Sequence, residues 1–451
     1  MLRTRPRAVQ QSLASYITPA ARRVFSSARP LVVLGLESSA DDTCAAIVTS
    51  ERKILANVVL KQHAIHESFG GIHPLHAQEA HQVNMPVAID KALTEAGIDL
   101  SELDGIAFTR GPGMYGCLSV CAGAAKALAA ATGKPLLGVH HMVSLPYVVI
   151  TSAHVGRACE ASEVATGRKR TPFTNRLRST SPVTDSPTPE FPFLTLLLSG
   201  GHTLLLLARS ISSFSILATT HDESIGASID KVARDLEIPW ALGAGSPGAA
   251  LERFAFPNGL AGGSGPGSDL EEESADLPPA PTFTQPFARR LAFSYAGLRS
   301  ALTRLLEAEP SAQMAKARKR QIARAFSLAA FKQIEDKVVF ALEKMREEGH
   351  EPVRGLVVSG GVASNLILRE RLRLRLDKAG RVDLPLIFPP PALCTDNAAM
   401  IAYVGLLRLQ RGLIDPLTVM QRSKWPIDEC EADFADETEA AEQEQRRGSA
   451  S

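Results

Sequence analysis

The stretch LLLSGGHT at residues 196–203 constrains this chain more than any other. An apolar run over residues 193–198 predicts a buried strand, and a second apolar run over residues 204–207 follows at once. Two glycines between buried strands predict a tight hairpin whose backbone N–H groups face a ligand, because no side chain stands in the way. A hydroxyl beside such a turn suits phosphate or carbamoyl oxygens. The competing interpretation is a plain hairpin that binds nothing.

The same signature returns at residues 356–365, which read LVVSGGVASN. Here the two glycines lead from a predicted strand into a predicted helix, and a helix N-terminus favours anions. We therefore expect two related halves that face one nucleotide across a shared crevice.

The N-terminal half of the chain predicts an α/β fold. Residues 31–36 and 44–48 are predicted strands joined by a polar turn, as in the first phosphate hairpin of actin-like ATPases and sugar kinases. Residues 104–139 then read as strand, glycine-rich turn, small-residue helix and strand, which is a crossover unit. With 451 residues, 45% of them hydrophobic, the chain is long enough to form two lobes with separate cores.

Two carboxylates, Asp41 and Asp42, stand at the tip of the predicted N-terminal hairpin. There they are placed to orient a cation, an amine or a water. A solvated turn with capping aspartates is an equally open interpretation. Asp396 lies at the predicted start of the last helix and has two possible roles. Aspartate is a normal N-cap. The proline-rich loop before it instead favours a side chain that points into the crevice.

Composition divides the chain into six segments. Residues 1–30 contain six arginines and no lysine or acidic residue, which predicts a mitochondrial transit peptide and hence a matrix protein; a basic RNA-binding arm is the alternative. Residues 31–150 are the expected N-terminal lobe, 151–190 a linker or atypical insertion, and 191–395 the C-terminal lobe with a low-complexity insertion at 257–286. Residues 396–425 are the expected closing helix, which returns to the N-terminal lobe, and 426–451 an acidic, disordered tail.

Cysteine content and hydropathy exclude two classes of protein. The six cysteines form no CxxC pair, which suits a reducing compartment and no structural zinc. No apolar run reaches about 18 residues, so we expect no membrane span and no membrane partner.

Residues 62–81 are rich in histidine. A histidine cluster suggests a metal site, but most of these rings would fall on different faces of the turn before a helix predicted for residues 74–96. We favour a substrate-facing loop and keep a metal site as the alternative. The histidines are His63, His66, His73, His76 and His81.

A long amphipathic helix is predicted over residues 312–346, and its first turns, 316–324, are strongly basic. A charge run on a helix is usually a solvated face. A contact with nucleic acid is the alternative interpretation.

Taken in order, the motifs of this chain resemble one family. They are GLESSADDT, HESFGGIHPLHAQEAH, RGPGMYGCLSV, GVHHM, LLLSGGHT, ESIGASIDKVARDL, FSYAGLRSAL, SGGVASN and PPPALCTDNAAMIAYVG. The set resembles the tRNA threonylcarbamoyladenosine transferase family, formerly called O-sialoglycoprotein endopeptidases. With its arginine-rich start the chain is most similar to the mitochondrial eukaryotic branch. The resemblance covers residues 31–428 apart from two segments.

The resemblance implies an α/β, actin-like (ASKHA) fold with two ribonuclease-H-like lobes around a nucleotide cleft. It implies transfer of a threonylcarbamoyl group from threonylcarbamoyl-AMP to the exocyclic amine of the adenosine 3′ of the anticodon, in tRNAs that read ANN codons. Our own hypothesis from the residue types is that Asp41 and Asp42 take the proton of the amine. By motif match, the residues that would hold the adenylate are Leu197, Leu198, Ser199, Gly200, Gly201, Asp230, Gly248 and Asn365.

The resemblance also implies one divalent metal ion per subunit, iron or zinc. His141 and Asp396 would be ligands, together with a second histidine four residues after the first. Here Leu145 stands in that place, and leucine cannot ligate. Residues 143–171 look unlike the family, and we interpret them as an inserted stretch; His140 and His154 lie nearby but lack the required spacing.

The implied partners are tRNA, a second copy of the chain in a homodimer, and a separate threonylcarbamoyl-AMP synthase, because no second catalytic domain fits in this length. Two alternatives stay open, a catalytically impaired nucleotide- or RNA-binding scaffold and an actin-like small-molecule kinase. The kinase would begin Asp-x-Gly-x-Thr, whereas this chain has Glu37-Ser38-Ser39. A metallopeptidase would need a His-Glu-x-x-His helix, which the sequence lacks.

Overall fold

The computed structural model of the protein describes residues 29–66, 72–144, 190–210, 213–240, 246–260, 277–389 and 397–430. Several predicted features lie outside the described residues. They are the transit peptide up to residue 28, Leu145, the linker up to residue 189, residues 261–276 of the low-complexity insertion, Asp396 and the tail after residue 430.

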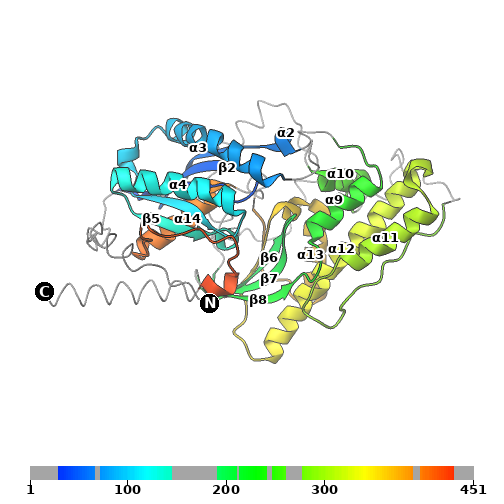
Figure 1. Cartoon of the computed structure of the whole chain (residues 1–451). Helices are drawn as coiled ribbons and strands as arrows, with labels where there is room; N and C mark the ends of the chain where they lie inside the picture. The colour runs from blue at the N-terminus through cyan, green and yellow to red at the C-terminus, as the bar shows by residue number, and fades with distance from the viewer. Residues whose placement is uncertain are drawn as a thin grey trace, which may run out of the picture.

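The first sheet has five strands in the order β3-β2-β1-β4-β5. Neighbours β1 (Val32–Glu37), β2 (Thr43–Thr49) and β3 (Ile54–Leu60) are antiparallel. The other two strands, β4 (Gly105–Gly111) and β5 (Leu136–His140), run parallel to β1. This sheet forms the lobe on the left in Figure 1.

Helices cover both faces of the first sheet. α3 (Pro74–Ala96) and α4 (Tyr115–Thr132) pack on one face, where Leu34 and Leu36 of β1 join their core. α14 (Ala398–Gln410) packs against β1, β2 and β4 on the other face, where Val33 points. The alternation along β1 is that of a strand buried on both sides. By length and composition α4 is apolar enough to cross a membrane, and here it packs against β4 and α3.

The second sheet repeats the order of the first, β10-β9-β6-β7-β8. Neighbours β6 (Phe193–Leu198), β7 (Thr203–Ala208) and β8 (Phe214–Thr219) are antiparallel, while β9 (Leu356–Ser359) and β10 (Leu386–Ile387) run parallel to β6. Two sheets of three antiparallel and two parallel strands in one order are what a pair of ribonuclease-H-like lobes requires. The predicted α/β, actin-like fold class is therefore confirmed.

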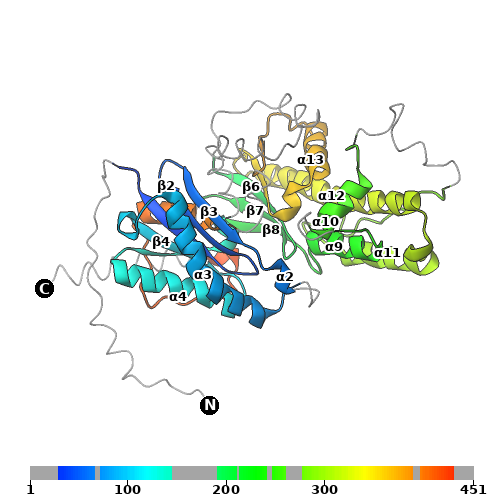
Figure 2. The ribbon, with the colours of Figure 1, turned by 90° about the horizontal axis from the view of Figure 1, so that it is seen from above.

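Within the described residues, five longer helices belong to the second lobe. They are α9 (Ile225–Asp235), α10 (Pro247–Ala255), α11 (Ala296–Ala308), α12 (Lys316–Glu347) and α13 (Leu366–Lys378). Figures 1 and 2 show β6, β7 and β8 between the first lobe and α9, α11 and α12. The short elements are α2 (His63–His66), α5 (His141–Ser144), η3 (Leu100–Glu102), η6 (Ser311–Gln313), η7 (Gly361–Ser364) and η9 (Ile427–Glu429).

Most predicted elements are confirmed, including the strand over residues 193–198 and the helix over 74–96. The start of the long basic helix at residue 312 was wrong. α12 begins at Lys316, because Pro310 and the short η6 turn come first and Ala315 has extended backbone angles. The basic residues therefore lie in the first turns of the helix.

Candidate active site

Two glycine turns leave the same edge of the second sheet. β6 runs parallel to β9, and Leu197 is paired in register with Ser359. Both strands end together, so the turns at 199–201 and 359–361 lie side by side. The expectation that each turn belongs to a different half of the molecule was wrong, since both belong to one lobe. A repeated short motif cannot distinguish neighbouring strands of one sheet from equivalent strands of two sheets.

The turn at residues 199–201 is held from within. Ser199 Oγ accepts the backbone N–H groups of Gly201 and His202 at 3.3 and 3.0 Å. Ser224 donates its hydroxyl to the carbonyl of Gly200 at 2.5 Å. The hydroxyl of Ser199, which we expected beside a ligand, is therefore committed to the turn itself.

The outer side of both turns is open. A Cβ atom added at Gly200, Gly201 or Gly361 would meet no atom within 4 Å. The side chains of Leu197 and Leu198 are buried in two different cores, so these residues can offer a ligand only their backbone. A ligand can therefore approach the backbone of the turns closely, which is the property that their glycines predict.

Two further glycines are needed for packing. A Cβ at Gly226 would lie 2.5 Å from the carbonyl oxygen of Ser199, and one at Gly360 would lie 2.4 Å from that of Leu198. Gly360 also has a φ of 94°, which only glycine adopts easily. Sequence reasoning missed Gly226, whose role appears only when α9 is seen against the turn.

Asp230 and Gly248 meet across two helices. The N–H of Gly248, in the first turn of α10, donates to Oδ1 of Asp230 on α9 at 2.7 Å. Burial raises the pKa of Asp230, and the hydrogen bond from Gly248 and the charge of Arg234 oppose that rise. A Cβ at Gly248 would lie 3.0 Å from the Asp230 carboxylate, so a larger residue would push that side chain aside by a few tenths of an ångström. Ala249, the next residue, is helical and accommodates its methyl group.

Asn365 begins α13, next to the second turn. Its side-chain oxygen accepts the N–H of Leu368 at 2.9 Å and so caps the helix. Glu252, on α10, reaches across and accepts the N–H of Leu366 at 2.7 Å. Sequence reasoning missed Glu252, because nothing in its spacing indicates a partner more than a hundred residues away. Glu252 therefore connects α10, which carries Gly248, with α13, which Asn365 caps.

The hairpin between β1 and β2 carries Asp41 and Asp42. The hydroxyl of Ser38 donates to the carbonyl of Cys117 at 2.7 Å, and Ser39 O accepts the N–H of Met114 at 3.0 Å. These contacts fix the hairpin against the start of α4. Asp42 is largely buried and Asp41 is half-buried.

His141 follows β5 and lies against the floor of this hairpin. Its Nδ1 is 3.1 Å from Oε2 of Glu37, a fully buried carboxylate that also accepts the hydroxyl of Thr109. Burial alone would raise the pKa of Glu37, but the charge and hydrogen bond of His141, with the bonds from Ser39 and Thr109, lower it to about 2. Glu37 is therefore an ionised partner that orients the His141 ring.

His140 cannot replace a missing metal ligand. Its Nε2 donates to the carbonyl of Trp425 at 2.9 Å, and its Nδ1 accepts the N–H of Met142 at 3.1 Å. Burial lowers the pKa of His140 to about 3, with smaller contributions from its neighbours. Both ring nitrogens are committed, so this histidine is a structural residue of the core.

The metal site implied by the resemblance is incomplete in this chain. Among the described residues no three histidine, cysteine, aspartate or glutamate side chains gather to hold a metal. His141 is present and oriented by Glu37, Asp396 lies outside the described ranges, and position 145 is leucine. The residues present do not fit a three-ligand site.

The histidine-rich segment forms a buried hydrogen-bond network. Gln62 contacts both His66 and His81 at 3.1 Å, and Thr43 Oγ1 is 2.8 Å from Nδ1 of His81. Nε2 of His81 donates to the carbonyl of Ala40 at 3.0 Å. His81 therefore fixes the hairpin that carries Asp41 and Asp42. Burial lowers the pKa of His81, which keeps the ring neutral.

The basic first turns of α12 are occupied by contacts within the protein. Arg320 and Arg324 donate to the carbonyls of Phe254 and Ala255 at the end of α10, at 3.2 and 2.6 Å. Arg318 is buried and forms two bonds of 3.0 Å with Glu309. This segment caps α10 and holds the lobe together, which favours the structural interpretation over a nucleic-acid contact.

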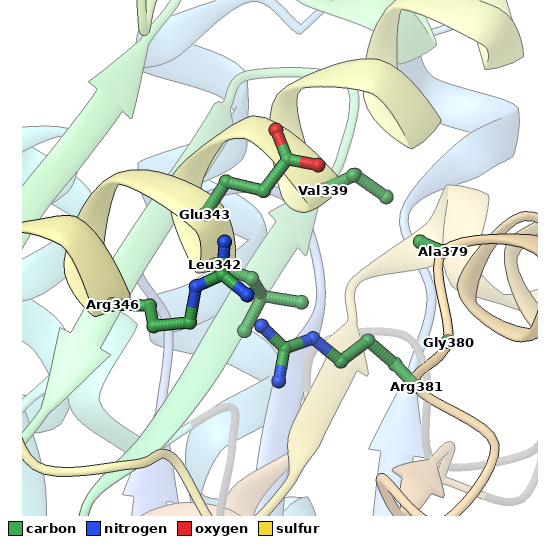
Figure 3. A pocket seen from close by; sticks show the side chains of 7 residues that line it. All are labelled: Val339, Leu342, Glu343, Arg346, Ala379, Gly380 and Arg381. Atoms are coloured by element: carbon green, nitrogen blue, oxygen red, sulfur yellow. The ribbon is translucent and has the colours of Figure 1, made fainter.

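A small cavity of 180 Å³ lies at the far end of the second lobe (Figure 3). It is formed by the C-terminal part of α12, with Glu343 and Arg346, and by the turn after α13, with Arg381. α13 has 13 residues and starts at the glycine turns. Its two ends are therefore about 20 Å apart, so the cavity is separate from the candidate site.

The repeated sheet order and the two open turns at one sheet edge define an actin-like α/β protein. Comparison with known families is then specific. The family described as TsaD, tRNA N6-adenosine threonylcarbamoyltransferase, matches residues 53–156 and 178–403. The chain belongs to this family of transferases. The match leaves residues 157–177 uncovered, within the segments that look unlike the family or like a linker.

Curated relatives cover nearly the whole chain. The protein named tRNA N6-adenosine threonylcarbamoyltransferase from Sphingopyxis alaskensis is 35% identical over 399 residues, 88% of this chain and 96% of the relative. The proteins of the same name from Chelativorans sp. and Granulibacter bethesdensis are 36% and 32% identical over 413 and 412 residues. The alignments cover 89% and 91% of this chain and 96% of each relative.

Solved structures are more distant. HypF from T. kodakarensis aligns with 85% of this chain and 49% of its own, at 14% identity and a TM-score of 0.48. The activator of 2-hydroxyisocaproyl-CoA dehydratase from Clostridium difficile aligns with 87% of this chain and all of its own, at 10% identity and a TM-score of 0.40.

Proposed function

We propose that this protein transfers the threonylcarbamoyl group of threonylcarbamoyl-AMP to the exocyclic amine of the adenosine 3′ of the anticodon in mitochondrial tRNAs that read ANN codons. The observation that carries the proposal is the pairing of two open glycine turns at one sheet edge, Leu197 beside Ser359. Family membership supplies the chemical class of the reaction.

In this proposal the adenylate lies along the open side of the two turns. Backbone N–H groups at Gly200 and Gly361 face its phosphate without rearrangement, and Gly201 leaves the approach to the turn open. Asp230 and Asn365, which flank the turns, bind the nucleoside part. Gly248 leaves room for the nucleoside, since even a methyl group there would press on Asp230.

The transfer step needs a base. The amine nitrogen of the adenosine attacks the carbamoyl carbon, the bond from that carbon to the phosphate oxygen breaks, and AMP leaves with the electron pair. The proton released by the amine goes to a carboxylate, Asp41 or Asp42. Both stand on a hairpin fixed by His81 and the start of α4. A variant Asp41→Ala that keeps full transfer activity would contradict this role for Asp41.

The divalent ion, iron or zinc, remains a prediction from the resemblance, with His141 and Asp396 as its ligands. Leu145 supplies no donor, and the transfer step proposed above does not use the ion. Leu145 also supports the alternative of a catalytically impaired scaffold. Transfer activity of the purified chain would exclude that alternative.

The mitochondrial matrix is proposed from residues 1–30 alone. Six arginines without an acidic residue are typical of a transit peptide. A fluorescent fusion of residues 1–35 should enter mitochondria. A fusion that stays in the cytosol would contradict the location and the choice of mitochondrial tRNAs, while the chemistry of transfer would stand.

A homodimer is proposed through α3 and α4. A groove of 630 Å³ between these helices is lined by apolar side chains such as Ile89, Leu93 and Leu128. Val83 and Val87 on α3 expose 71% and 43% of their surface nearby. An exposed apolar surface of this kind favours association. In sedimentation experiments Val83→Glu should convert a dimer to a monomer. The threonylcarbamoyl-AMP synthase would be a separate protein.

The tRNA specificity is tested with transcripts. Unmodified mitochondrial tRNAs that read ANN codons should gain one threonylcarbamoyl group at the adenosine 3′ of the anticodon, detected by nucleoside mass spectrometry. Transcripts that read other codons should gain none. Equal modification of both sets would contradict the codon rule but leave the transfer reaction in place.

A further inference from the structure

A short turn near the candidate site presents an aromatic ring to solvent. Phe287 has a φ of 52°, in the left-handed region that bulky residues rarely adopt. The N–H of Arg290 closes the turn on the carbonyl of Phe287 at 3.0 Å. Phe287 nevertheless exposes 37% of its surface. The ring is therefore not fully buried, and burial alone does not offset the backbone strain.

The carbonyl of this residue is held from inside the lobe. Lys337, on α12, is 2% exposed and donates its ammonium group to the carbonyl of Phe287. A buried ammonium group is unfavourable unless it is well bonded. Two unfavourable features, the buried charge of Lys337 and the positive φ of Phe287, thus converge on one turn. Local strain of this kind persists mainly at functional sites.

Cationic and aromatic side chains frame the exposed ring. The His221 ring meets it edge-on, with centroids 5.7 Å apart and planes at 67°. The guanidinium carbon of Arg290 lies 5.3 Å from the ring centroid. Arg289 is exposed beside them. Neither arginine forms an ion pair with any residue in the part of the chain that the structure describes.

Two carboxylates, those of Asp222 and Glu223, follow His221 in the sequence. The carboxylate of Asp222 accepts the hydroxyl of Ser294 and the N–H of Tyr295, at 2.5 and 2.9 Å. Glu223 pairs with Lys231 at 2.7 Å and Arg299 at 3.3 Å. Among the described residues neither carboxylate forms an ion pair with Arg289 or Arg290, so both guanidinium groups can bind an external anion.

The turn is adjacent to the loop that leads to the glycine turns. His221 donates its N–H to the carbonyl of Phe293 at 3.0 Å, which joins the two segments. Three residues later, Ser224 bonds the carbonyl of Gly200. Three extended residues span at most about 11 Å, so the ring is within reach of a few nucleotides from the proposed adenylate site.

We propose that Phe287, Arg289 and Arg290 form a binding surface for the RNA substrate. An unstacked base of the anticodon loop stacks on the Phe287 ring, and the two arginines bind the adjoining phosphates. Single-stranded RNA is recognised in this way, by stacking on aromatic rings and guanidinium planes. The proposal deepens the proposed function and depends on tRNA being the acceptor.

The test measures binding of a fluorescently labelled anticodon stem-loop RNA to the full chain by anisotropy. Phe287→Leu should weaken binding about tenfold and Phe287→Tyr should bind within about twofold of wild type, because stacking needs an aromatic ring. Phe287→Gly relieves the positive φ, so it should weaken RNA binding without lowering the melting temperature. Equal RNA affinity of the wild-type, Leu and Gly proteins would overturn the proposal.

Salt dependence tests the arginines. The double variant Arg289→Ala/Arg290→Ala should reduce the slope of log affinity against log salt by about 1.4, since each phosphate contact to single-stranded RNA contributes about 0.7. Arg304→Ala, which removes an exposed arginine from α11, is the matched control and should leave the slope unchanged. An unchanged slope in the double variant would also overturn the proposal.

The outcomes separate this surface from the reaction. If wild type binds the RNA through Phe287 but transfers no acyl group, the surface stands and the proposed function fails. If wild type transfers the group and all the Phe287 and arginine variants match it in RNA binding, the function stands and the surface fails.

Discussion

The carboxylate of Glu252 on α10 accepts the backbone N–H of Leu366, the first residue of α13, at 2.7 Å. A carboxylate at a helix N-terminus is stabilised by the unpaired N–H groups and the helix dipole. The bond fixes Asn365, which precedes Leu366, relative to Gly248 on α10. Two residues proposed to hold the adenylate thus owe their relative position to Glu252.

Glu252→Ala should therefore weaken AMP binding by about tenfold, which corresponds to ~1.4 kcal/mol for one lost charge-assisted hydrogen bond. The measurement is calorimetric titration of AMP into the full chain. Glu252→Gln keeps an acceptor oxygen and should recover most of the affinity. Arg253→Ala, at the exposed neighbouring position, is the control. Glu252→Ala with wild-type AMP affinity would show that the bond has no positioning role.

Gly226→Ala should destabilise the protein. The added Cβ would lie 2.5 Å from the carbonyl of Ser199, so α9 or the turn must move. We expect the free energy of unfolding in urea to fall by ~1–3 kcal/mol, even though alanine is the better helix former. Gly201→Ala meets no atom and should change stability by less than ~0.5 kcal/mol. Gly201→Ala should instead reduce AMP binding. Equal stability of the two variants would contradict the assigned roles.

Acid should weaken the fold through His81. Burial lowers the pKa of His81 below its unfolded value of about 6.5. Between the two pKa values the unfolded chain binds more protons, so stability falls as the pH is lowered, by at most about 1.4 kcal/mol per pH unit from this group. His81→Gln should show a flatter decline between pH 7 and pH 5 in urea denaturation.

His76→Gln is the matched control for this pH effect. His76 is half-buried, lies 3.0 Å from Glu79, and has its ring 4.6 Å from that of His73. It should keep the wild-type pH dependence. The same decline in all three proteins would show that His81 titrates normally in the folded state.

Leu145→His should restore metal binding. In the pattern that the resemblance implies, a second histidine stands four residues after His141, whereas Leu145 has no donor atom. We expect the variant to bind Zn²⁺ about tenfold tighter than wild type, or more, since an imidazole adds a bond to the ion. The readout is equilibrium dialysis with elemental analysis. Adding His141→Ala should abolish the gain. A wild-type chain that already holds one tightly bound metal, unaffected by Leu145→His, would contradict the prediction.

Local sequence patterns predicted most of the fold. The apolar run at 193–198 and the helix at 74–96 form as expected, because burial and periodicity there agree with the tertiary structure. The open glycine turns were also predicted from their composition. These features depend on residues close together in the sequence, so they can be recognised before the fold is known.

The arrangement of the site could not be predicted in the same way. Whether two Ser-Gly-Gly turns occupy one sheet or two is decided by strand pairing between residues far apart in the sequence, such as Leu197 and Ser359, which are 162 positions apart. The roles of Gly226 and Glu252 depend on neighbours brought in by the fold. The basic turn of α12 was ambiguous for the same reason, since its acceptors on α10 are distant in sequence.

The most direct test of the central claim combines the purified full chain, threonylcarbamoyl-AMP labelled in the threonine, and an unmodified tRNA that reads an ANN codon. Label should move to the tRNA with release of AMP, and Gly201→Ala should slow that transfer while the protein stays folded. Label that is never found on tRNA, although the chain is folded and binds AMP, would contradict the account.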